Sequence, residues 1–146
     1  MLYLGSLYKE YHQVTFLKGV GINVIATDNI KIAICHMINV CEKIIGINKG
    51  IVYVVLKNPE RIKTNDLGGA VFVFNEKDFT KNDQNNWVSI DSNILPAESI
   101  IYDSTYNALK KYEIQIYHCK NENFENLKEQ EKINLNELEP FCLQSY

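Results

Sequence analysis

The strongest pattern in the chain lies in Ile22–Gly46, INVIATDNIKIAICHMINVCEKIIG. It opens with the apolar run Val24-Ile25-Ala26, whose β-branched residues are typical of a short buried strand. The polar triplet Thr27-Asp28-Asn29 follows, and each of its side chains carries an oxygen that can accept from the free N–H groups of a helix's first turn. We therefore expect a strand, a tight turn and then a helix that begins at Ile30.

The residues after this turn have the pattern of one long amphipathic helix, because apolar side chains recur every three or four positions. They are Ile30, Ala33, Ile34, Met37, Ile38, Cys41, Ile44 and Ile45. Gly46 would then stand just beyond the C-terminus of the helix, a position that favours glycine. The pattern predicts a long helix over residues 30–45 that packs on the core.

Outward from this stretch, short apolar runs predict further strands. They are Leu2–Gly5, Ile51–Leu56, Ala70–Phe74, Trp87–Ile90, Ile94–Tyr102 and Glu113–Cys119. Ile51–Leu56 is apolar throughout, as in a strand covered on both faces, and we expect it to pair with Ala70–Phe74 in an antiparallel ribbon. Ile94–Tyr102 contains Pro96, which is typical of a sheet edge. Leu7–Lys18 has no clean period and is interpreted as a loop with one helical turn, and Asn75–Asn86 as an exposed loop.

The C-terminal third adds shorter helices. Asp103-Ser104 can cap a helix over residues 105–112, and Asn123–Lys132 is a second helical candidate. The fold class is therefore α+β, with a mixed, mainly antiparallel sheet of about six strands and one long helix packed on it. Residues 1–120 form a single α+β domain. Residues 121–146 form an acidic, partly helical tail that docks on the domain through Leu135, Leu138, Phe141 and Leu143.

The composition restricts the class of partner. The chain has 146 residues, a net charge of −3 and a sequence pI of about 5.6. Its one arginine, Arg61, and its acidic balance argue against a nucleic-acid-binding surface, which needs clustered cations. No run approaches the roughly 20 apolar residues of a membrane span, and the first residues lack the basic region of a signal peptide. We expect a cytoplasmic protein with four reduced cysteines, and its many Ile, Asn and Lys codons suggest an AT-rich bacterial genome.

Metal and nucleophile chemistry are weakly indicated. The three histidines, His12, His36 and His118, form no metal-binding spacing, so we expect no metal site. Cys35-His36 and His118-Cys119 place a thiol beside an imidazole in sequence, but adjacent side chains do not face each other on a helix or a strand. These residues are better explained as packing residues.

Two positions have both a structural and a binding interpretation. Thr27 and Asp28 either cap the expected helix or line an anion or ribose pocket at its N-terminus. Trp87 is either a core anchor or the wall of a ligand site. Residue chemistry alone leaves both alternatives open.

A family resemblance bears on these positions. Leu2-Tyr3-Leu4-Gly5-Ser6, Val24-Ile25-Ala26-Thr27-Asp28 before a helix, and Trp87-Val88-Ser89 with Pro96 beyond it resemble a group of small uncharacterised bacterial proteins. Those proteins typically open with Leu-Tyr-His-Gly-Ser, continue with a Phe-Ala-Thr strand before a helix, and end with a Tyr-Val-Ser strand. Their motifs in turn resemble the NAD-binding fold of ADP-ribosyltransferases, over about the first 120 residues here.

The resemblance implies a nucleotide cleft lined by Tyr3, Gly5, Ser6, Thr27, Asp28 and Trp87. In that family the first-strand histidine holds a ribose and the backbone of the next glycine pairs with the nicotinamide amide. Here Leu4 replaces the histidine while Gly5 is kept. The family's catalytic glutamate would fall just before Trp87, where Asn85 and Asn86 stand. Glu98 and Glu113 are the candidates to replace it.

Three functions follow as hypotheses. The first is an ADP-ribosyltransferase-like domain with a degenerate catalytic site that binds a nucleotide or a protein ligand in its cleft. The second is an active NAD-dependent transferase that uses Glu98 or Glu113. The third is a non-enzymatic protein-interaction module of phage or mobile-element origin. NAD is the possible cofactor in the first two.

Overall fold

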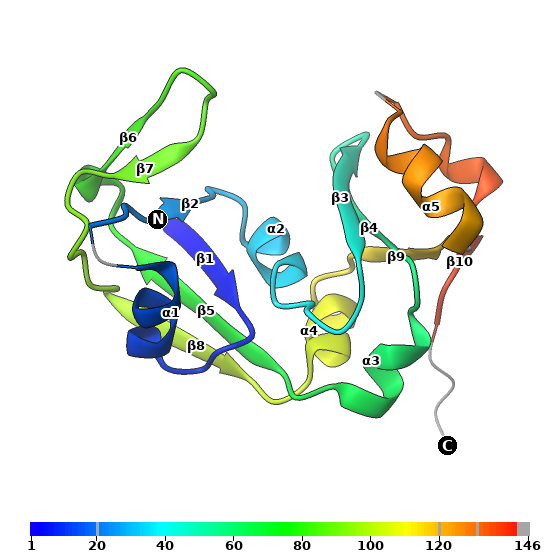
Figure 1. The fold of residues 1–146 in the computed structure, drawn as a ribbon, viewed down its shortest axis with the longest axis horizontal. Helices are drawn as coiled ribbons and strands as arrows, with labels where there is room; N and C mark the ends of the chain where they lie inside the picture. Colours follow the sequence, from blue (N-terminus) through cyan, green and yellow to red (C-terminus); the bar gives the residue numbers. More distant parts are fainter. Residues whose placement is uncertain (20, 120, 131, 143–146) are drawn as a thin grey trace.

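The computed structural model describes residues 1–19, 21–119, 121–130 and 132–142. It is an α+β structure with mainly antiparallel sheets, which confirms the expected fold class (Figure 1). The helices are α1 (Tyr11–Lys18), α2 (Ile30–Cys35), α3 (Glu60–Asn65), α4 (Thr105–Lys111) and α5 (Asn121–Lys128). The strands are β1 (Leu2–Ser6), β2 (Ile25–Ala26), β3 (Lys43–Asn48), β4 (Ile51–Leu56), β5 (Gly69–Phe74), β6 (Phe79–Lys81), β7 (Trp87–Ser89), β8 (Glu98–Tyr102), β9 (Gln115–His118) and β10 (Glu139–Pro140).

The strands form three sheets. Two have three strands each, in the orders β1-β5-β8 and β2-β7-β6, and all their pairs are antiparallel. The third has the order β10-β9-β4-β3, with β4 and β9 parallel. A single antiparallel bridge between Tyr3 and Thr27 links the first two sheets.

The predicted long helix over residues 30–45 is wrong. α2 ends at Cys35, and residues 43–48 form β3, which pairs with β4 in six register positions. Lys49 and Gly50 connect the two strands with φ values of 52° and 80°, the left-handed backbone that a tight hairpin turn needs. The run Ile44-Ile45-Gly46-Ile47 is apolar enough to fit the period of a helix or of a strand. It forms a strand because it pairs with β4.

Gly46 is therefore not the terminal residue of a helix. It lies within β3 opposite Tyr53, and a Cβ placed on it would be 2.3 Å from the Tyr53 hydroxyl oxygen. The glycine makes room for the tyrosine ring across the strand pair.

Two further expectations are corrected. Residues 11–18 form the helix α1 rather than a loop with one helical turn. β4 and β5 do not pair with each other, because α3 intervenes and the two strands enter different sheets. In place of the expected sheet of about six strands under one long helix, the described residues form these three smaller sheets and five short α-helices.

Several local expectations are confirmed. β4 is a central strand with five of its six residues buried, and β8 stands at a sheet edge. The Ser104 hydroxyl accepts from the Asn107 N–H at 3.1 Å, which caps α4 as its sequence indicates. β7 and β9 form close to their expected positions.

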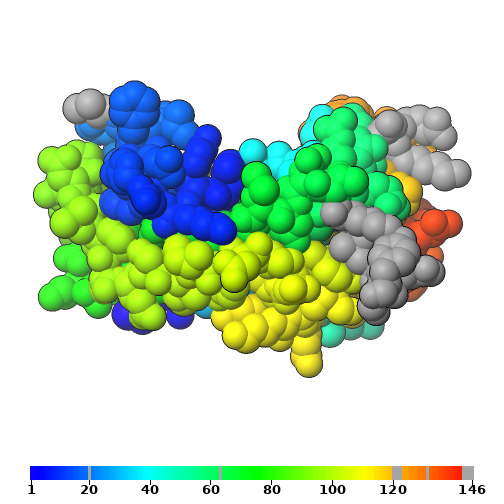
Figure 2. All heavy atoms as spheres, turned by 90° about the horizontal axis from the view of Figure 1, so that it is seen from below, coloured from blue at the N-terminus to red at the C-terminus, as the bar shows by residue number. Residues whose placement is uncertain are grey.

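The main core joins two of the sheets through α2. Ala33 and Ile34 are fully buried between Val71 of β5 and Val54 of β4. α4 contributes Leu109 to the same cluster. Figure 1 shows α2 between β1 and β4, and in Figure 2 its cyan atoms lie at the base of a notch in the outline, between the blue and green segments.

The opposite face of β1 and β5 is covered by α1. Tyr11 packs edge-on against Phe72 and Phe74, with ring centroids 5.2 and 5.9 Å apart, and Val14 joins the same cluster. The two faces of this sheet are thus covered by two different short helices.

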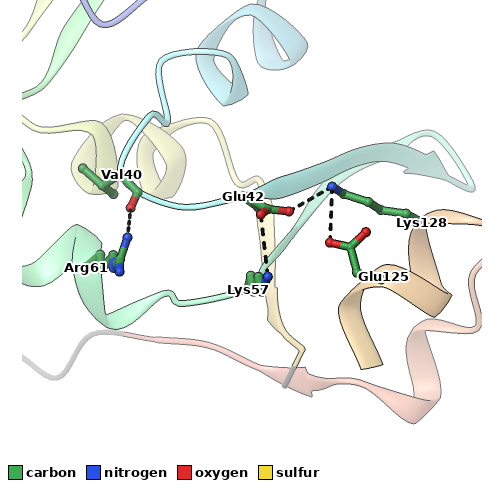
Figure 3. A network of polar contacts seen from close by, with 6 residues as sticks. All are labelled: Val40, Glu42, Lys57, Arg61, Glu125 and Lys128. Carbon is green, nitrogen blue, oxygen red and sulfur yellow. Dashed lines mark hydrogen bonds and ion pairs between the residues drawn. The ribbon is translucent and has the colours of Figure 1, made fainter. Parts of the chain in front are cut away.

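The C-terminal segment packs on the outer face of β4. Phe124 of α5 is fully buried against Tyr53 and Val55. Figure 3 shows Glu42 between two lysines, with Lys128 of α5 at 2.9 Å and Lys57 at 3.6 Å.

The expected docking residues of the tail fall in two places. Leu135 and Leu138 pack on the Phe124 cluster, whereas Phe141 packs on the α2 cluster, and Leu143 lies outside the described residues. Among the described residues, no helix has both the length and the apolar character needed to cross a membrane.

Candidate functional site

Three motifs that are far apart in the sequence lie on adjacent strands. Tyr3 of β1 bridges Thr27, with the Tyr3 N–H donating to the Thr27 oxygen at 2.7 Å and the Thr27 N–H donating back at 2.9 Å. Ala26, the neighbour of Thr27, stands opposite Trp87 of β7. The opening motif, the strand-to-helix turn and the Trp-Val-Ser strand therefore meet in one region.

β1 and β2 separate directly after this bridge. Continuing their antiparallel register would place Gly5 opposite Ile25, but among the described residues the pairing of the two strands is limited to Tyr3 and Thr27. Backbone groups alternate between the two edges of a strand, so the N–H and C=O of Gly5 point to the same edge as those of Tyr3. Both Gly5 and Ile25 thus present peptide groups to a slot between the strands.

The other face of Gly5 is closed by α2. A Cβ placed on Gly5 would be 1.6 Å from the backbone oxygen of Ala33, so β1 and α2 are in contact at this point. Gly5 itself is half-buried. The side of Gly5 on which a Cβ would stand is therefore closed by α2.

The turn before α2 is held by its own side chains. The Thr27 hydroxyl accepts from the Asn29 N–H at 3.1 Å, and the Asn29 side chain caps the helix by accepting from the Lys31 N–H at 3.0 Å. Asp28 is exposed. Asn29 and Thr27 therefore have a structural role in capping the helix and holding the turn. The Asp28 side chain takes part in neither bond and faces solvent.

Leu4 and Ser6 point away from the α2 face of β1. Leu4 packs on the cluster covered by α1, and the Ser6 hydroxyl accepts from the Tyr8 N–H at 3.0 Å. Leu4 is therefore a packing residue, and Ser6 is engaged in a local turn.

The positions before Trp87 hold a turn. The Asn82 side chain accepts from the Asn86 N–H at 2.9 Å and from the Gln84 N–H at 3.0 Å, and Asn85 has a φ of 65°. These amides shape the β6–β7 hairpin, and they carry no charge.

The two candidate glutamates lie in different parts of the fold, Glu98 in β8 and Glu113 in the turn before β9. Glu98 stands opposite Val73, which stands opposite Tyr3, so Glu98 is two strands or roughly 10 Å from Tyr3. Glu113 has a φ of 57° in the turn before β9. It lines a cavity of about 410 Å³ with Lys110, Gln115 and Tyr117, at the β9 end of the molecule.

Trp87 is half-buried and lies under a cation. The Lys81 ammonium is 5.2 Å from the centroid of its ring, and the indole Nε1 is buried with no acceptor among the described residues. Lys81 and Trp87 are directly opposite in the β6–β7 pair. Residues 75–86 were interpreted as an exposed loop, so the sequence did not indicate this pair.

Asp66 forms a second polar cluster that the sequence did not indicate. Its carboxylate accepts from the Ser104 hydroxyl and the Thr105 N–H, both at 2.7 Å, and from the Tyr106 and Gly68 N–H groups at 3.0 and 3.2 Å. Burial raises the pKa of Asp66, but these hydrogen bonds lower it further, so the net pKa lies below its ordinary value. The carboxylate joins the start of β5 to the start of α4.

Three of the cysteines, Cys35, Cys41 and Cys119, have the properties of packing residues. Burial raises the pKa of Cys35 to about 12, and it also raises the pKa of Cys41 and Cys119, so these thiols stay protonated near neutral pH. Among the described residues, no group of three or more His, Cys, Asp or Glu side chains could hold a metal ion.

Two further cavities lie away from the Glu113 cavity. A groove of about 1310 Å³ runs between α1 and residues 92–96, and a smaller cavity of about 120 Å³ lies beside Asp66 and Met37. The six residues expected to line a nucleotide cleft belong to neither of them, nor to the cavity at Glu113. Tyr3 and Thr27 form the bridge at one end of the slot between β1 and β2, and Gly5 lies on its β1 side.

Comparisons of the chain with models of protein families, with curated proteins and with solved structures gave no match. A function for this chain is therefore inferred from the separation of β1 and β2 and from the short motifs on β1, β2 and β7.

Proposed function

We propose that this chain is an ADP-ribosyltransferase-like domain that binds a nicotinamide nucleotide at the slot between β1 and β2 without turning it over. The observation that carries the proposal is the separation of the two strands after the Tyr3–Thr27 bridge, which leaves the peptide groups of Gly5 and Ile25 facing each other.

The slot has the hydrogen-bonding pattern of a carboxamide site. A carboxamide offers one acceptor and N–H donors on one edge, and the N–H and C=O of Gly5 on one strand edge complement that pair as a neighbouring strand would. Because α2 closes the opposite side of Gly5, a planar group would enter from the solvent edge.

The lack of turnover follows from the groups that surround the slot. Cleavage of a nicotinamide glycosidic bond builds positive charge on the ribose, which an adjacent carboxylate stabilises. By the resemblance, Leu4 and either Asn85 or Asn86 stand at the two family positions that would contact the ribose, and none of these side chains carries a charge. Glu98 is two strands from Tyr3, and Glu113 belongs to the β9 end.

The test combines binding with mapping of the site. Titration of the ¹⁵N-labelled chain with NAD and with nicotinamide should shift the amide signals of Gly5 and Ile25, whereas Ile116, buried on β9, should stay unmoved. Nicotinic acid is the matched ligand control, since its carboxylate lacks the N–H donor that the Gly5 carbonyl would accept. We expect binding of nicotinamide and a clear loss of binding for nicotinic acid.

Two outcomes would replace the proposal. Release of nicotinamide from NAD, abolished by Glu98→Gln, would make the chain an active transferase. Absence of any shift at millimolar NAD would remove the nucleotide slot and favour the interaction module. Gly5→Ala is not a usable probe of binding, because the added Cβ would overlap Ala33 and disrupt the fold.

A further inference from the structure

The hairpin of β3 and β4 ends in a strand edge that has no neighbour. β3 is the last strand of the sheet β10-β9-β4-β3, and in the part of the chain that the structure describes it pairs with β4 alone. α2 and α5 belong to the apolar clusters on the two faces of this sheet, and Figure 1 shows one helix on each side of the hairpin. The helices thus cover the faces of β3 and not its edge.

The pairing with β4 identifies the peptide groups on this edge. The Lys57 N–H donates to the Glu42 carbonyl oxygen at 3.1 Å, so Glu42 and every second residue after it turn their peptide groups toward β4. Lys43, Ile45 and Ile47 therefore turn theirs to the free edge. Their N–H and C=O groups have the spacing that a neighbouring antiparallel strand requires.

β3 lacks the features that keep strand edges apart. Proteins block exposed edges with charged side chains, with proline or by making the strand very short. β8 carries Glu98, β6 carries Lys81, and β10 has two residues, one of them Pro140. β3 has six residues and a single charge, Lys43, whose ammonium turns inward and donates to the Ile38 carbonyl oxygen. The outer edge of β3 is therefore uncharged and long enough to pair with another strand.

The side chains along this edge are apolar on both faces. Ile47 is 54% exposed, and Ile45, on the same face, is half-buried against the α2 cluster. On the other face Gly46 has no side chain, and the Tyr53 hydroxyl lies where a Cβ would stand, with its oxygen 2.3 Å from that position. A strand that pairs with this edge would therefore meet isoleucine on one face and a tyrosine hydroxyl on the other.

We propose that β3 is the interface of a homodimer, in which a second copy of this chain pairs its own β3 antiparallel to this one about a two-fold axis. Residues that stand opposite each other in such a pair have their side chains on the same face, so the axis must pass through a residue of β3. It passes at Gly46, where each exposed Ile47 stands opposite Ile45 of the other copy. An axis at Ile45 would instead place Ile47 opposite Lys43.

A second copy fits this edge because the edge is complementary to itself. Each pair of Ile45 with Ile47 exchanges two main-chain hydrogen bonds and joins two β-branched side chains across the strands. Symmetry supplies both pairs at once, and it brings the two Tyr53 hydroxyls together beside the Gly46 axis. An unrelated strand would have to carry a matching apolar side chain at each position.

The same sheet explains why the assembly would stop at two copies. In the dimer both outer edges of the joined sheet are formed by β10. Pro140 has no N–H to offer a further strand, and Glu139 carries a charge. The open edge of β3 is used up by the two-fold pairing, so the contact closes on itself and does not continue into a fibre.

The first experiment is sedimentation equilibrium of the full chain over a range of concentrations. A single pair of edge strands is smaller than the roughly 1,200 Å² of a stable interface, so we expect a weak dimer with a Kd on the order of 10–100 µM. The measurement therefore extends from about 1 µM to about 1 mM. A chain that remains monomeric throughout would overturn the proposal.

A matched pair of variants locates the interface. Ile47→Lys should weaken the dimer at least about tenfold, because it places a charge on the edge and in the apolar pair. Ile101→Lys changes an isoleucine that is 48% exposed on the edge strand β8, and it should leave the dimer unchanged. Both residues are exposed, so dilute samples should keep the melting temperature of the wild type. A dimer that survives Ile47→Lys, or one that Ile101→Lys abolishes, would overturn the assignment to β3.

Amide hydrogen exchange tests the pairing itself. The N–H groups of Ile45 and Ile47 should exchange freely in dilute solution and become protected as the concentration rises through the Kd. Those of Ile44 and Gly46, which face β4, should be protected at every concentration. Protection of Ile45 and Ile47 in the dilute monomer would show that the chain covers this edge itself and would overturn the proposal.

Two further outcomes separate this interface from other ligands. Gly5, which reports on the nucleotide slot, lies on β1 and should not change with concentration, so either proposal can fail without the other. Protection of Ile45 and Ile47 by an unrelated strand-forming peptide, in a chain that does not dimerise, would overturn the second copy as the occupant of this edge.

Discussion

Two short helices cover opposite faces of β1 and β5, and they do so in different ways. α2 buries Ala33, Ile34 and Cys35 completely, and it contacts β1, β5, β4 and α4. α1 has two more residues but buries none of them fully, and it is held by Tyr11 and Val14. The difference teaches that helix length is a poor guide to structural importance here.

The two coverings suit different tasks. On the α2 side, the backbone of β1 and the backbone of α2 are in direct contact, because a Cβ on Gly5 would overlap Ala33. The α1 side leaves Phe16 and Leu17, both exposed, lining a groove. A region with few buried apolar contacts contributes little to the stability of the fold, and its exposed side chains are free to contact a ligand.

The largest expected effect is on the α2 side. Ile34→Ala should lower the free energy of unfolding by about 3 kcal/mol, because it removes a fully buried side chain from a core that cannot collapse around the cavity. Phe16→Ala, the matched change on α1, should change it by less than about 0.5 kcal/mol. Urea unfolding followed by circular dichroism measures both. Equal decreases in the free energy of unfolding for the two variants would mean that α1 contributes as much to the core as α2.

The Asp66 cluster should show the next largest effect. Asp66 links α3 to α4, which packs on α2, and its pKa lies below the ordinary value of 3.8. A carboxylate with a lowered folded-state pKa contributes stability above pH 3.8 and loses it as the pH falls through the folded-state pKa. Asp66→Asn should therefore cost about 1–2 kcal/mol at neutral pH, a value reduced because the group is partly solvated.

The measurement for Asp66 is the pH dependence of thermal unfolding. The stability difference between the wild-type chain and Asp66→Asn should shrink as the pH falls below 3.8 and vanish once the pH is below the lowered folded-state pKa, where the native carboxylate is protonated. Asp83→Asn, at an exposed loop residue, serves as the control and should follow the wild type at every pH. A constant difference between wild type and Asp66→Asn at all pH values would show that shape, and not charge, matters at this position.

The sequence predicts the elements that depend on local patterns. β4 is apolar throughout, β9 alternates, and Ser104 caps α4 at the expected residue. The failures occur where a distant partner decides. Residues 43–48 have the apolar content of a helix or a strand, and their pairing with β4 settles the choice.

The candidate site shows the same limit. The motifs on β1, β2 and β7 could be named from the sequence, but the slot depends on where two strands separate, which no local pattern encodes. Asp66 bonds to residues 38 to 40 positions away. Phe16 and Leu17 lie next to each other in the sequence and show no helical period, so neither α1 nor the groove it lines was predicted.

A smaller effect of opposite sign is expected on the α1 side. Lys18→Met should raise the free energy of unfolding by about 1 kcal/mol, because it replaces an unpaired buried ammonium by an apolar chain of similar length. Burial lowers the pKa of Lys18, so its cost is full at neutral pH and disappears as the pH rises through the lowered pKa toward 10.5. Thermal unfolding between pH 7 and pH 10.5 checks this, and a destabilised Lys18→Met would mean that the ammonium has a stabilising partner.

The smallest effect should come from the charges that hold α5. Glu42 bonds Lys128 at 2.9 Å, and this bond with the neighbouring lysines lowers the pKa of Glu42. Glu42 and Lys128 are exposed and Lys57 is half-buried. Ion pairs at the surface contribute little and are screened by salt. Glu42→Gln should therefore lower the melting temperature slightly in low salt and not at all in 1 M salt. The burial of Phe124, rather than the ion pairs, would then hold α5 on β4. A loss that persists in high salt would show instead that this surface network is a structural part of the fold.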